Sequence, residues 1–463
     1  MMTLRQALDW ITSAGLSATL VGDADVRIDR VHTDTRTVRH GDLFVALKGE
    51  RFDANDFLTQ ASQQGAVAAI ALRGLATAQL SGLEVQDARL AMAFLARAWR
   101  AQFAIPMVAV TGSNGKTTVT QMIASIFSTY KQDDAFSTQG NLNNDIGVPL
   151  TLLRLREHHR LGVVELGMNH PGEIAVLAGL TKPTIALVNN AQREHLEFMG
   201  TVDAVARENG AVIASLDAQG TAVFPADDEH SDQWRELAGS REVLTFAIAT
   251  SADICASAEW VGTGWEVLAS TPAGPIGFSL AIAGWHNVKN ALAATACALA
   301  AGVPAEYITQ GLSAFVPVKG RSRAILLERR GHPLTLIDDT YNANPDSMRA
   351  AIEVLASLPG PRLLVMGDMG EVGDHGPQFH DEAGRLARDM GVEKLFSLGD
   401  QAARAAHSFR GGRHFDDVDS LNAAVLAELP HLGGVLVKGS RFMKMERVVQ
   451  AITAQEKQPR ETT

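Results

Sequence analysis

Short apolar runs alternate with stretches of helical periodicity along most of the chain. Near the N-terminus, VRIDRVHTD and GDLFVALKG have the pattern of strands, and FLTQASQQGAVAAIAL has the pattern of an alanine-rich helix. Residues 1–84 therefore predict a small α/β domain. The next stretch, LEVQDARLAMAFLARAWRAQF, is predicted to be a helix that leads to Pro106. This change of pattern places a domain boundary near residue 84.

A strand, a glycine turn and a helix are predicted directly after Pro106. The strand is PMVAVT and the turn is GSNGKTT; the helix VTQMIASIFSTY has one apolar face, made by Val119, Met122, Ile123, Ile126 and Phe127. Further buried strands are predicted at LGVVELG and TIALVNN. Apolar strands that alternate with helices are typical of a parallel sheet covered on both faces. Residues 85–316 are therefore expected to form a nucleotide-binding domain.

A second series of strands and helices is predicted over residues 317–463. PLTLIDDTY, RLLVMGDMG, KLFSLGD and GVLVKGS each predict a strand that runs into a polar or glycine turn. Open parallel sheets bind ligands at such strand ends, so we expect a ligand between this sheet and the central one. The polar stretch from Ala451 to Thr463 is expected to fray.

Composition and charge narrow the class of protein. The chain has 463 residues, is 46% hydrophobic and carries a formal net charge of -11, which argues against a nucleic-acid-binding protein. Its two cysteines, Cys255 and Cys297, lie far apart and offer neither a disulfide framework nor zinc-ligand spacing. No signal-peptide pattern and no apolar run of membrane-spanning length is present. A cytoplasmic protein without membrane insertion is expected.

The glycine turn after PMVAVT has the composition of a phosphate-binding loop. Backbone N–H groups between a strand and a helix can surround phosphate oxygens, Lys116 would reach the terminal phosphates, and the Thr117 hydroxyl would bind Mg²⁺. Val110 stands where the usual motif has its first glycine, so the loop is two residues shorter than in kinases and GTPases. The loop residues expected at ATP are Gly112, Ser113, Asn114, Gly115, Lys116, Thr117 and Thr118.

Ten segments in order resemble the Mur ligase family, and together they cover nearly the whole chain. They are DTRTVRHGDLFVALKGERFDANDF, TGSNGKTT, TQGNLNNDIGVPLTLL, VVELGMN, NNAQREHLE, GWHNVKNALAA, VKGRS, DDTYNANPDSM, VMGDMGEVG and VLVKGSRFMKME. The resemblance implies three α/β domains: an N-terminal domain that binds a UDP-sugar, a central P-loop ATPase domain with a parallel sheet, and a C-terminal Rossmann-like domain that closes over both.

The resemblance also implies the reaction. Mur ligases use ATP and Mg²⁺ to convert a peptide carboxylate into an acyl phosphate, which an amine then attacks. TQGNLNNDIGVP and DDTYNANPDSM are most similar to the branch that adds D-alanyl-D-alanine to UDP-N-acetylmuramoyl tripeptide in peptidoglycan precursor synthesis. Those two molecules are the expected partners, and a monomer is expected.

By resemblance, the chemical step depends on Lys116, Glu165, His195 and Arg321, and Mg²⁺ is held by Thr117, Glu165 and His195. The adenine is expected at the start of the helix in GWHNVKNALAA, where asparagine amides can both donate and accept hydrogen bonds. The further ATP-binding residues implied are His286, Asn287, Asn290, Arg321 and Asp339.

The resemblance assigns substrate binding to three segments. An arginine suits recognition of the anionic UDP-sugar, and clustered amides can bind peptide groups. The residues implied are Thr35, Arg36, Lys48 and Gly49 in the first segment, Asn141, Asn143 and Asn144 in the second, and Tyr341, Asn342 and Asn344 in the third.

One position departs from the family. Many Mur ligases carry a carbamylated lysine about 14 residues after the metal-binding histidine, where this chain has Asn209. Asparagine cannot form a carbamate, so the second Mg²⁺ is expected to bind less tightly unless Glu208 or water compensates.

Other classes share parts of this pattern. A sister ligase that adds one amino acid, or a folylpolyglutamate synthase, would share the ATPase core, but the N-terminal segment DTRTVRHGDLFVALKGERFDANDF favours the UDP-sugar group. A nucleotide switch or P-loop kinase would need the longer loop. A non-catalytic scaffold would not need Lys116, Thr117, Glu165 and Arg321 together.

Overall fold

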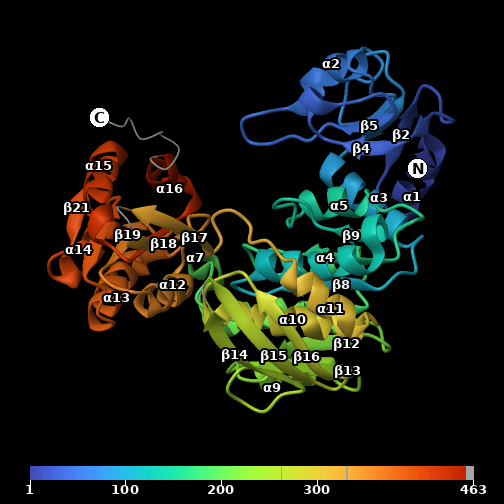
Figure 1. Ribbon diagram of the computed structural model, residues 1–463. Helices are drawn as coiled ribbons and strands as arrows, with labels where there is room; N and C mark the ends of the chain where they lie inside the picture. The colour runs from blue at the N-terminus through green and yellow to red at the C-terminus, as the bar shows by residue number, and fades with distance from the viewer. Residues whose placement is uncertain (262, 330–331, 455–463) are drawn as a thin grey trace, which may run out of the picture.

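The computed structural model describes residues 1–261, 263–329 and 332–454. It contains three α/β domains, each built around its own sheet from one unbroken stretch of chain. In Figure 1 the central domain lies between the N-terminal domain, drawn in blue, and the C-terminal domain, drawn in orange and red. The polar stretch expected to fray overlaps the last helix up to Ala454, and the rest of it lies outside the described residues.

The N-terminal domain has a five-stranded sheet in the order β2-β7-β6-β5-β4, in which only the β2–β7 pair is antiparallel. A two-stranded sheet pairs β1 with β3. The elements are β1 Met2–Thr3, α1 Leu4–Ser13, β2 Ala18–Val21, β3 Arg27–Ile28, β4 Arg30–His32, β5 Asp42–Val45, α2 Leu58–Gln63, β6 Ala68–Ala71, β7 Gly82–Val85 and α3 Ala88–Arg100. Two 3-10 turns, η1 Thr35–Thr37 and η2 Ala54–Phe57, flank this sheet.

The helix predicted to include Leu83 begins five residues later, so its predicted start was wrong. Residues 82–85 form strand β7, and a side chain at Gly82 would place its Cβ 2.1 Å from the Ala69 carbonyl oxygen of the neighbouring strand. Asp87 caps α3, because its carboxylate accepts hydrogen bonds from the N–H groups of Arg89 and Leu90.

The central domain has a nine-stranded sheet in the order β16-β15-β14-β13-β12-β11-β8-β10-β9. Its strands are β8 Met107–Thr111, β9 Ala135–Ser137, β10 Leu161–Glu165, β11 Ile185–Val188, β12 Thr221–Pro225, β13 Glu242–Ala247, β14 Ile254–Val261, β15 Gly264–Thr271 and β16 Gly274–Leu280. Its helices are α4 Lys116–Lys131, α5 Gly147–Leu152, α6 Glu173–Thr181, α7 Leu196–Met199, α8 Val202–Ala214, α9 Ser231–Ala238, α10 Trp285–Ala300 and α11 Ala305–Ser313.

Both faces of the central sheet are covered, as the apolar strands predicted. Val108 and Val110 of β8 pack with α4, α10 and α11, while Met107 and Ala109 face the core that contains α3, α5, α6 and α8. The strands from β9 to β14 are parallel, and β15 and β16 extend the sheet in antiparallel pairs that the sequence analysis did not predict. Because α3 shares its core with both neighbouring sheets, it joins the first two domains.

The C-terminal domain has a six-stranded sheet in the order β17-β18-β22-β19-β20-β21, parallel except for the β17–β18 pair. Its strands are β17 Arg323–Arg329, β18 His332–Asp339, β19 Arg362–Gly367, β20 Lys394–Leu398, β21 Arg413–Phe415 and β22 Gly434–Lys438. Its helices are α12 Pro345–Ser357, α13 Gly376–Asp389, α14 Ala402–Phe409, α15 Val418–Glu428 and α16 Glu446–Ala454. Strand β22, although last in sequence, lies at the middle of the sheet.

Candidate active site

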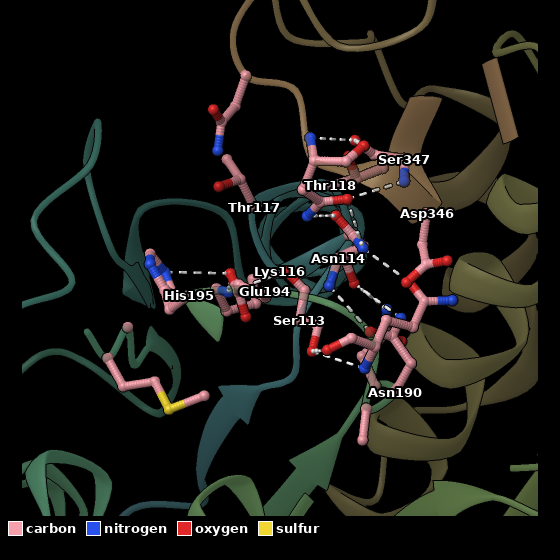
Figure 2. Close-up of a pocket in the computed structure, with 18 of the residues that line it drawn as sticks. Ser113, Asn114, Lys116, Thr117, Thr118, Asn190, Glu194, His195, Asp346 and Ser347 are labelled. Carbon is pink, nitrogen blue, oxygen red and sulfur yellow. Dashed lines mark hydrogen bonds and ion pairs between the residues drawn. The ribbon is translucent and has the colours of Figure 1, made fainter. Parts of the chain in front are cut away.

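One large cavity, of 1240 Å³, lies where the central and C-terminal domains meet. Strands β8, β10 and β11 end at it from the central domain, and β18 and β22 end at it from the C-terminal domain. Figure 2 shows part of its lining. The predicted site residues on its walls are Ser113, Asn114, Gly115, Lys116, Thr117, Thr118, Asn143, Asn144, Glu165, His195, His286, Asn287, Asn290, Arg321, Asp339, Tyr341, Asn342 and Asn344.

The phosphate loop is shaped by two glycines with positive φ. Gly112 has φ +126° and Gly115, the residue before α4, has φ +83°. A Cβ at Gly115 would lie 2.7 Å from amide atoms of Asn189 and Asn290, so the loop backbone packs too closely for a side chain. The loop therefore offers backbone N–H groups at the start of a 16-residue helix, a favourable place for phosphate.

Asn209 binds the backbone of this loop. Its side-chain Oδ1 accepts a hydrogen bond of 2.9 Å from the Gly112 N–H, and its side chain is 1% exposed. Glu208 caps helix α6 instead, with 2.8 Å bonds from the N–H groups of Gly172 and Ile174. The Asn209 and Glu208 side chains thus both accept hydrogen bonds from backbone N–H groups. Compensation by Glu208 at a metal would therefore require its two oxygens to bind the ion in addition to, or in place of, these two N–H groups.

Lys116 is held by three oxygen atoms. Its Nζ donates to the carbonyl oxygens of Gly112 at 2.6 Å and Ser113 at 3.1 Å, and forms an ion pair of 2.8 Å with Glu194 Oε1. The Lys116 and Glu194 side chains are 14% and 11% exposed. The lysine expected to reach the terminal phosphates therefore lies over the loop, with a carboxylate as its partner (Figure 2).

Glu165 has the properties of a cation ligand. It ends β10 with its side chain buried, and its Oε1 accepts bonds from the Thr117 hydroxyl at 3.1 Å and from Asn143 Nδ2 at 2.8 Å. Its Oε2 is buried and has no hydrogen-bond partner among the described residues. A hydroxyl and an unpartnered carboxylate oxygen at the phosphate loop fit Mg²⁺, which takes one or two carboxylates and completes its sphere with phosphate and water. Among the described residues, no group of three or more His, Cys, Asp or Glu side chains is arranged to hold a metal ion, so phosphate and water would have to supply the other ligands.

His195 lies between two carboxylates from different domains. Its Nε2 is 3.5 Å from Glu194 Oε1, and its Nδ1 is 3.0 Å from Oε2 of Glu371, which follows β19. Burial lowers the pKa of His195, but the two carboxylates outweigh burial and raise that pKa to about 9. A protonated imidazole cannot bind a metal, so the predicted ligand role requires His195 to leave Glu371.

A chain of amides connects the start of α10 to the phosphate loop. Asn290 Nδ2 donates to Asn287 Oδ1, Asn189 Nδ2 donates both to Asn290 Oδ1 and to the Asn114 carbonyl, and each of these bonds is 2.8 or 2.9 Å long. Burial, together with the charge of Lys438, lowers the pKa of the neighbouring His286 to about 4. The amides and the imidazole predicted to contact adenine are therefore uncharged and connect to the loop by hydrogen bonds.

The C-terminal domain supplies a second group of charges. The Arg321 guanidinium lies 4.1 Å from the centre of the Tyr341 ring, and its Nε is buried without a hydrogen-bond partner in the described chain. Asp339 accepts from Lys438 Nζ at 2.6 Å and from the Ser322 N–H at 3.0 Å. In this conformation the predicted ATP-contacting carboxylate is thus paired within its own domain.

Two further contacts join the domains across the cavity. Asn344, which caps α12, donates from Nδ2 to Asn114 Oδ1 at 2.9 Å. Arg193 forms ion pairs with Asp346 at 2.6 Å and Glu382 at 3.0 Å, and its side chain is 22% exposed. We call Arg193, Asp346 and Glu382 the interdomain ion-pair cluster.

Six predicted residues do not line this cavity. They are Thr35, Arg36, Lys48, Gly49, Gly112 and Asn141. Arg36 is paired with Asp34 at 2.7 Å, and its side chain is 83% exposed. The cavity therefore groups the predicted ATP and peptide residues except Gly112 and Asn141, and none of the four predicted residues of the N-terminal segment lines it.

Several charged residues at or beside the cavity were not singled out from the sequence, and four of them make the contacts described above. Arg193 and Glu194 lie in NNAQREHLE, Glu371 in VMGDMGEVG, and Lys438 in VLVKGSRFMKME. The available signal was their position after a predicted strand, where charged side chains of an open α/β sheet meet ligands. Apart from His195 beside Glu194, their ion-pair partners are 78 to 189 residues away in sequence, so these pairs could not be predicted.

Three domain descriptions match the chain in order: the catalytic domain of the Mur ligase family at residues 27–100, the Mur ligase middle domain at 110–298 and the Mur ligase glutamate ligase domain at 322–441. The chain is 41% identical to the UDP-N-acetylmuramoyl-tripeptide–D-alanyl-D-alanine ligase of Escherichia coli, over 96% of this chain and 98% of that protein.

Solved structures are similar over the same length. A crystal structure of MurF from Acinetobacter baumannii aligns with a TM-score of 0.89 at 35% identity, covering 98% of each chain. MurF ligase from Thermotoga maritima in complex with ADP aligns with a TM-score of 0.81 at 26% identity, covering 93% of this chain and 98% of that one. The order of the domains, the cavity and these relatives agree, and the chain belongs to the Mur ligase family.

Proposed function

We propose that the chain joins D-alanyl-D-alanine to UDP-N-acetylmuramoyl tripeptide with ATP and Mg²⁺, in the synthesis of a peptidoglycan precursor. The observation that carries the proposal is the single cavity that combines Lys116 of the phosphate loop with Arg321 of the C-terminal domain. The names of the relatives from Escherichia coli and Acinetobacter baumannii support the choice of substrates.

The chemistry proceeds in two transfers. An oxygen of the tripeptide's terminal carboxylate attacks the γ-phosphorus of ATP, and ADP leaves. The amine of the dipeptide then attacks the acyl carbon, phosphate leaves, and the amine loses a proton as the amide forms. Negative charge gathers at the phosphoryl group in the first transfer, so cations are the main requirement. Lys116 and Arg321 supply them from opposite walls.

The remaining ATP-site roles follow from the geometry. Thr117 and Glu165 would hold a Mg²⁺ ion, which neutralises phosphate charge, and His195 would join them once it leaves Glu371. The loop N–H groups from Gly112 to Thr118 would surround the phosphates. The adenine would lie against His286, Asn287 and Asn290, and Asp339 would turn toward ATP on exchanging its partner Lys438.

Substrate binding requires the N-terminal domain to approach the cavity. The UDP-sugar would bind Thr35, Arg36, Lys48 and Gly49, which lie away from the cavity walls. The peptide would extend past Asn141, Asn143 and Asn144 toward the residues of the C-terminal domain, which are Tyr341, Asn342 and Asn344. We propose domain limits of 1–84, 85–316 and 317–463; strand β7 runs one residue past the first limit, to Val85, and α3 then joins the first two domains.

We further propose that the protein acts as a cytoplasmic monomer. Cys297 is buried and both cysteines are free, which suits a reducing compartment. No helix within the described ranges has the length and apolar character to cross a membrane.

A reconstituted reaction tests the function. The protein is incubated with ATP, Mg²⁺, UDP-N-acetylmuramoyl tripeptide and D-alanyl-D-alanine, and mass spectrometry follows the pentapeptide product. Parallel reactions replace D-alanyl-D-alanine by single amino acids, or the tripeptide by shorter peptides and by a folate. Product formation with a single amino acid or the folate, and none with the dipeptide, would show a sister ligase or a folylpolyglutamate synthase instead.

A further inference from the structure

Glu194 is a buried carboxylate at the centre of the site. It lies in the loop between β11 and α7, and Figure 2 shows it between Lys116 and His195. Its Oε1 pairs with Lys116 Nζ at 2.8 Å, and its Oε2 is buried without a hydrogen-bond partner in the described chain. Half of this carboxylate is therefore already free to accept a ligand.

ATP binding would remove the partner of Glu194. Under the proposed function, Lys116 moves from Glu194 and two loop carbonyl oxygens to the terminal phosphates of ATP. The Glu194 side chain, 11% exposed, would then keep only the His195 ring, 3.5 Å from Oε1, among the contacts described above. A buried unpaired carboxylate is strongly unfavourable, so another cation is needed there when Lys116 leaves.

His195 alone cannot supply that charge. Its single ring lies between two carboxylates, 3.0 Å from Glu371 Oε2 and 3.5 Å from Glu194 Oε1, and under the proposed function it leaves Glu371 to bind Mg²⁺. ATP itself brings several negative charges into the same cavity. The positive charge must therefore come from an ion that enters with the nucleotide.

Neighbouring side chains that could have held such an ion have other partners. Asn209 is neutral and its Oδ1 accepts from Gly112, and Glu208 caps α6. By contrast, Glu165, a residue that is 2% exposed, and Glu194 both line the cavity, and each has one buried carboxylate oxygen without a hydrogen-bond partner among the described residues. Glu165 Oε2 and Glu194 Oε2 can therefore each bind a different cation.

We propose that Glu194 binds a second Mg²⁺ that enters with ATP, and that this ion replaces Lys116 as the partner of the Glu194 carboxylate. The inference rests on the proposed function, in which Thr117 and Glu165 hold the first ion. Phosphate oxygens and water would fill the remaining positions of the second ion. Glu194 thus supplies the negative charge that Asn209 does not.

Manganese binding tests the inference without a reaction. Mn²⁺ is titrated into the full-length protein with a non-hydrolysable ATP analogue, and free Mn²⁺ is measured by electron paramagnetic resonance. We expect the unmodified chain to bind two ions. Glu194→Gln should keep one ion and weaken the other at least ~10-fold, and Glu194→Asp should bind the second ion more tightly than Glu194→Gln. Glu197→Gln removes an exposed carboxylate three residues away and should leave both ions bound.

Three results would overturn the inference. The first is that Glu194→Gln binds both ions as the unmodified chain does. The second is that Glu194→Gln is folded by circular dichroism but loses the nucleotide and both ions together, since Glu194 would then only support the loop. The third is that the unmodified chain makes the pentapeptide yet binds one ion, which leaves the proposed function standing. Two bound ions without any ligase product would instead support the inference and refute the proposed function.

Discussion

Arg193→Met should separate the central and C-terminal domains. In the interdomain ion-pair cluster the Arg193 guanidinium bonds both Asp346 and Glu382, and the side chains of these three residues are 22%, 18% and 33% exposed. Exposed pairs contribute about 0–1 kcal/mol, and breaking a fully buried pair costs about 3–5 kcal/mol. A partly exposed cluster lies between these limits, at about 2–3 kcal/mol. This cost shifts the equilibrium between docked and undocked domains roughly 30- to 150-fold.

Two measurements on the ligand-free protein report this shift. Small-angle X-ray scattering should give a larger radius of gyration for Arg193→Met, and a protease should cleave the segment between Ser313 and Arg323 faster. Turnover should fall as well, because Arg321 and Asp339 lie on the domain that separates. Glu382 keeps its 2.6 Å contact with Arg349, so the C-terminal domain itself should remain folded.

Arg207→Met is the matched control. Arg207 pairs with Asp203 on α8, within one domain, and their side chains are 66% and 56% exposed. Its loss should leave scattering and cleavage unchanged. If Arg193→Met behaves like Arg207→Met in both measurements, the interdomain ion-pair cluster does not hold the domains together, and the contact between Asn114 and Asn344 becomes the main candidate.

Four shorter predictions follow from the site. Lys116→Ala should lower turnover at least ~10²-fold with unchanged circular dichroism, and near-normal turnover would refute the phosphate-loop assignment. Arg321→Ala should reduce turnover in steady-state kinetics more than it reduces UDP-substrate affinity in calorimetry; the reverse would contradict a role on domain closure. The pKa of His286 is about 4 in the folded protein and about 6.5 in the unfolded chain. Its contribution to stability is therefore complete above pH ~6.5 and is lost as pH falls toward 4. The urea midpoint of His286→Gln should fall less over this range than that of the unmodified protein, and an equal fall would refute the lowered pKa of His286. Intact-protein mass should show no carbon dioxide adduct on the segment around Asn209, and bicarbonate should not stimulate activity at low pH; rescue by bicarbonate would reveal a carbamylated lysine elsewhere.

The sequence predicted the parts of the site that depend on local structure. The phosphate loop has its function because a strand, two glycines with positive φ and a helix follow one another within a few residues. Glu165 and His195 were placed near it because each comes after a predicted parallel strand, and such strand ends meet at one edge of a sheet. Each of these residues could be predicted from its own segment of sequence, without knowledge of any distant contact.

The parts that depend on contacts between domains were not predictable in this way. Nothing local to Glu371 indicates His195, which is 176 residues earlier, as its partner. Asn209 illustrates the opposite case: its position in the chain suggested a metal, while its side chain holds the Gly112 N–H. The prediction of a helix at Leu83 was wrong because the close pairing of β7 with β6, rather than helical periodicity, decided the structure there.

The position of β22 affects when the enzyme can assemble during synthesis. This strand, Gly434–Lys438, separates β18 from β19 in the C-terminal sheet, so those two strands remain without their common neighbour until nearly the whole chain has left the ribosome. The N-terminal and central sheets, in contrast, are complete by Leu280 and can fold early. A ribosome-bound or truncated chain would therefore carry a finished phosphate loop but lack Lys438 and the ordered sheet that holds Arg321 opposite that loop. Synthesis of β22 thus determines when Arg321 and Lys438 can be held opposite the phosphate loop.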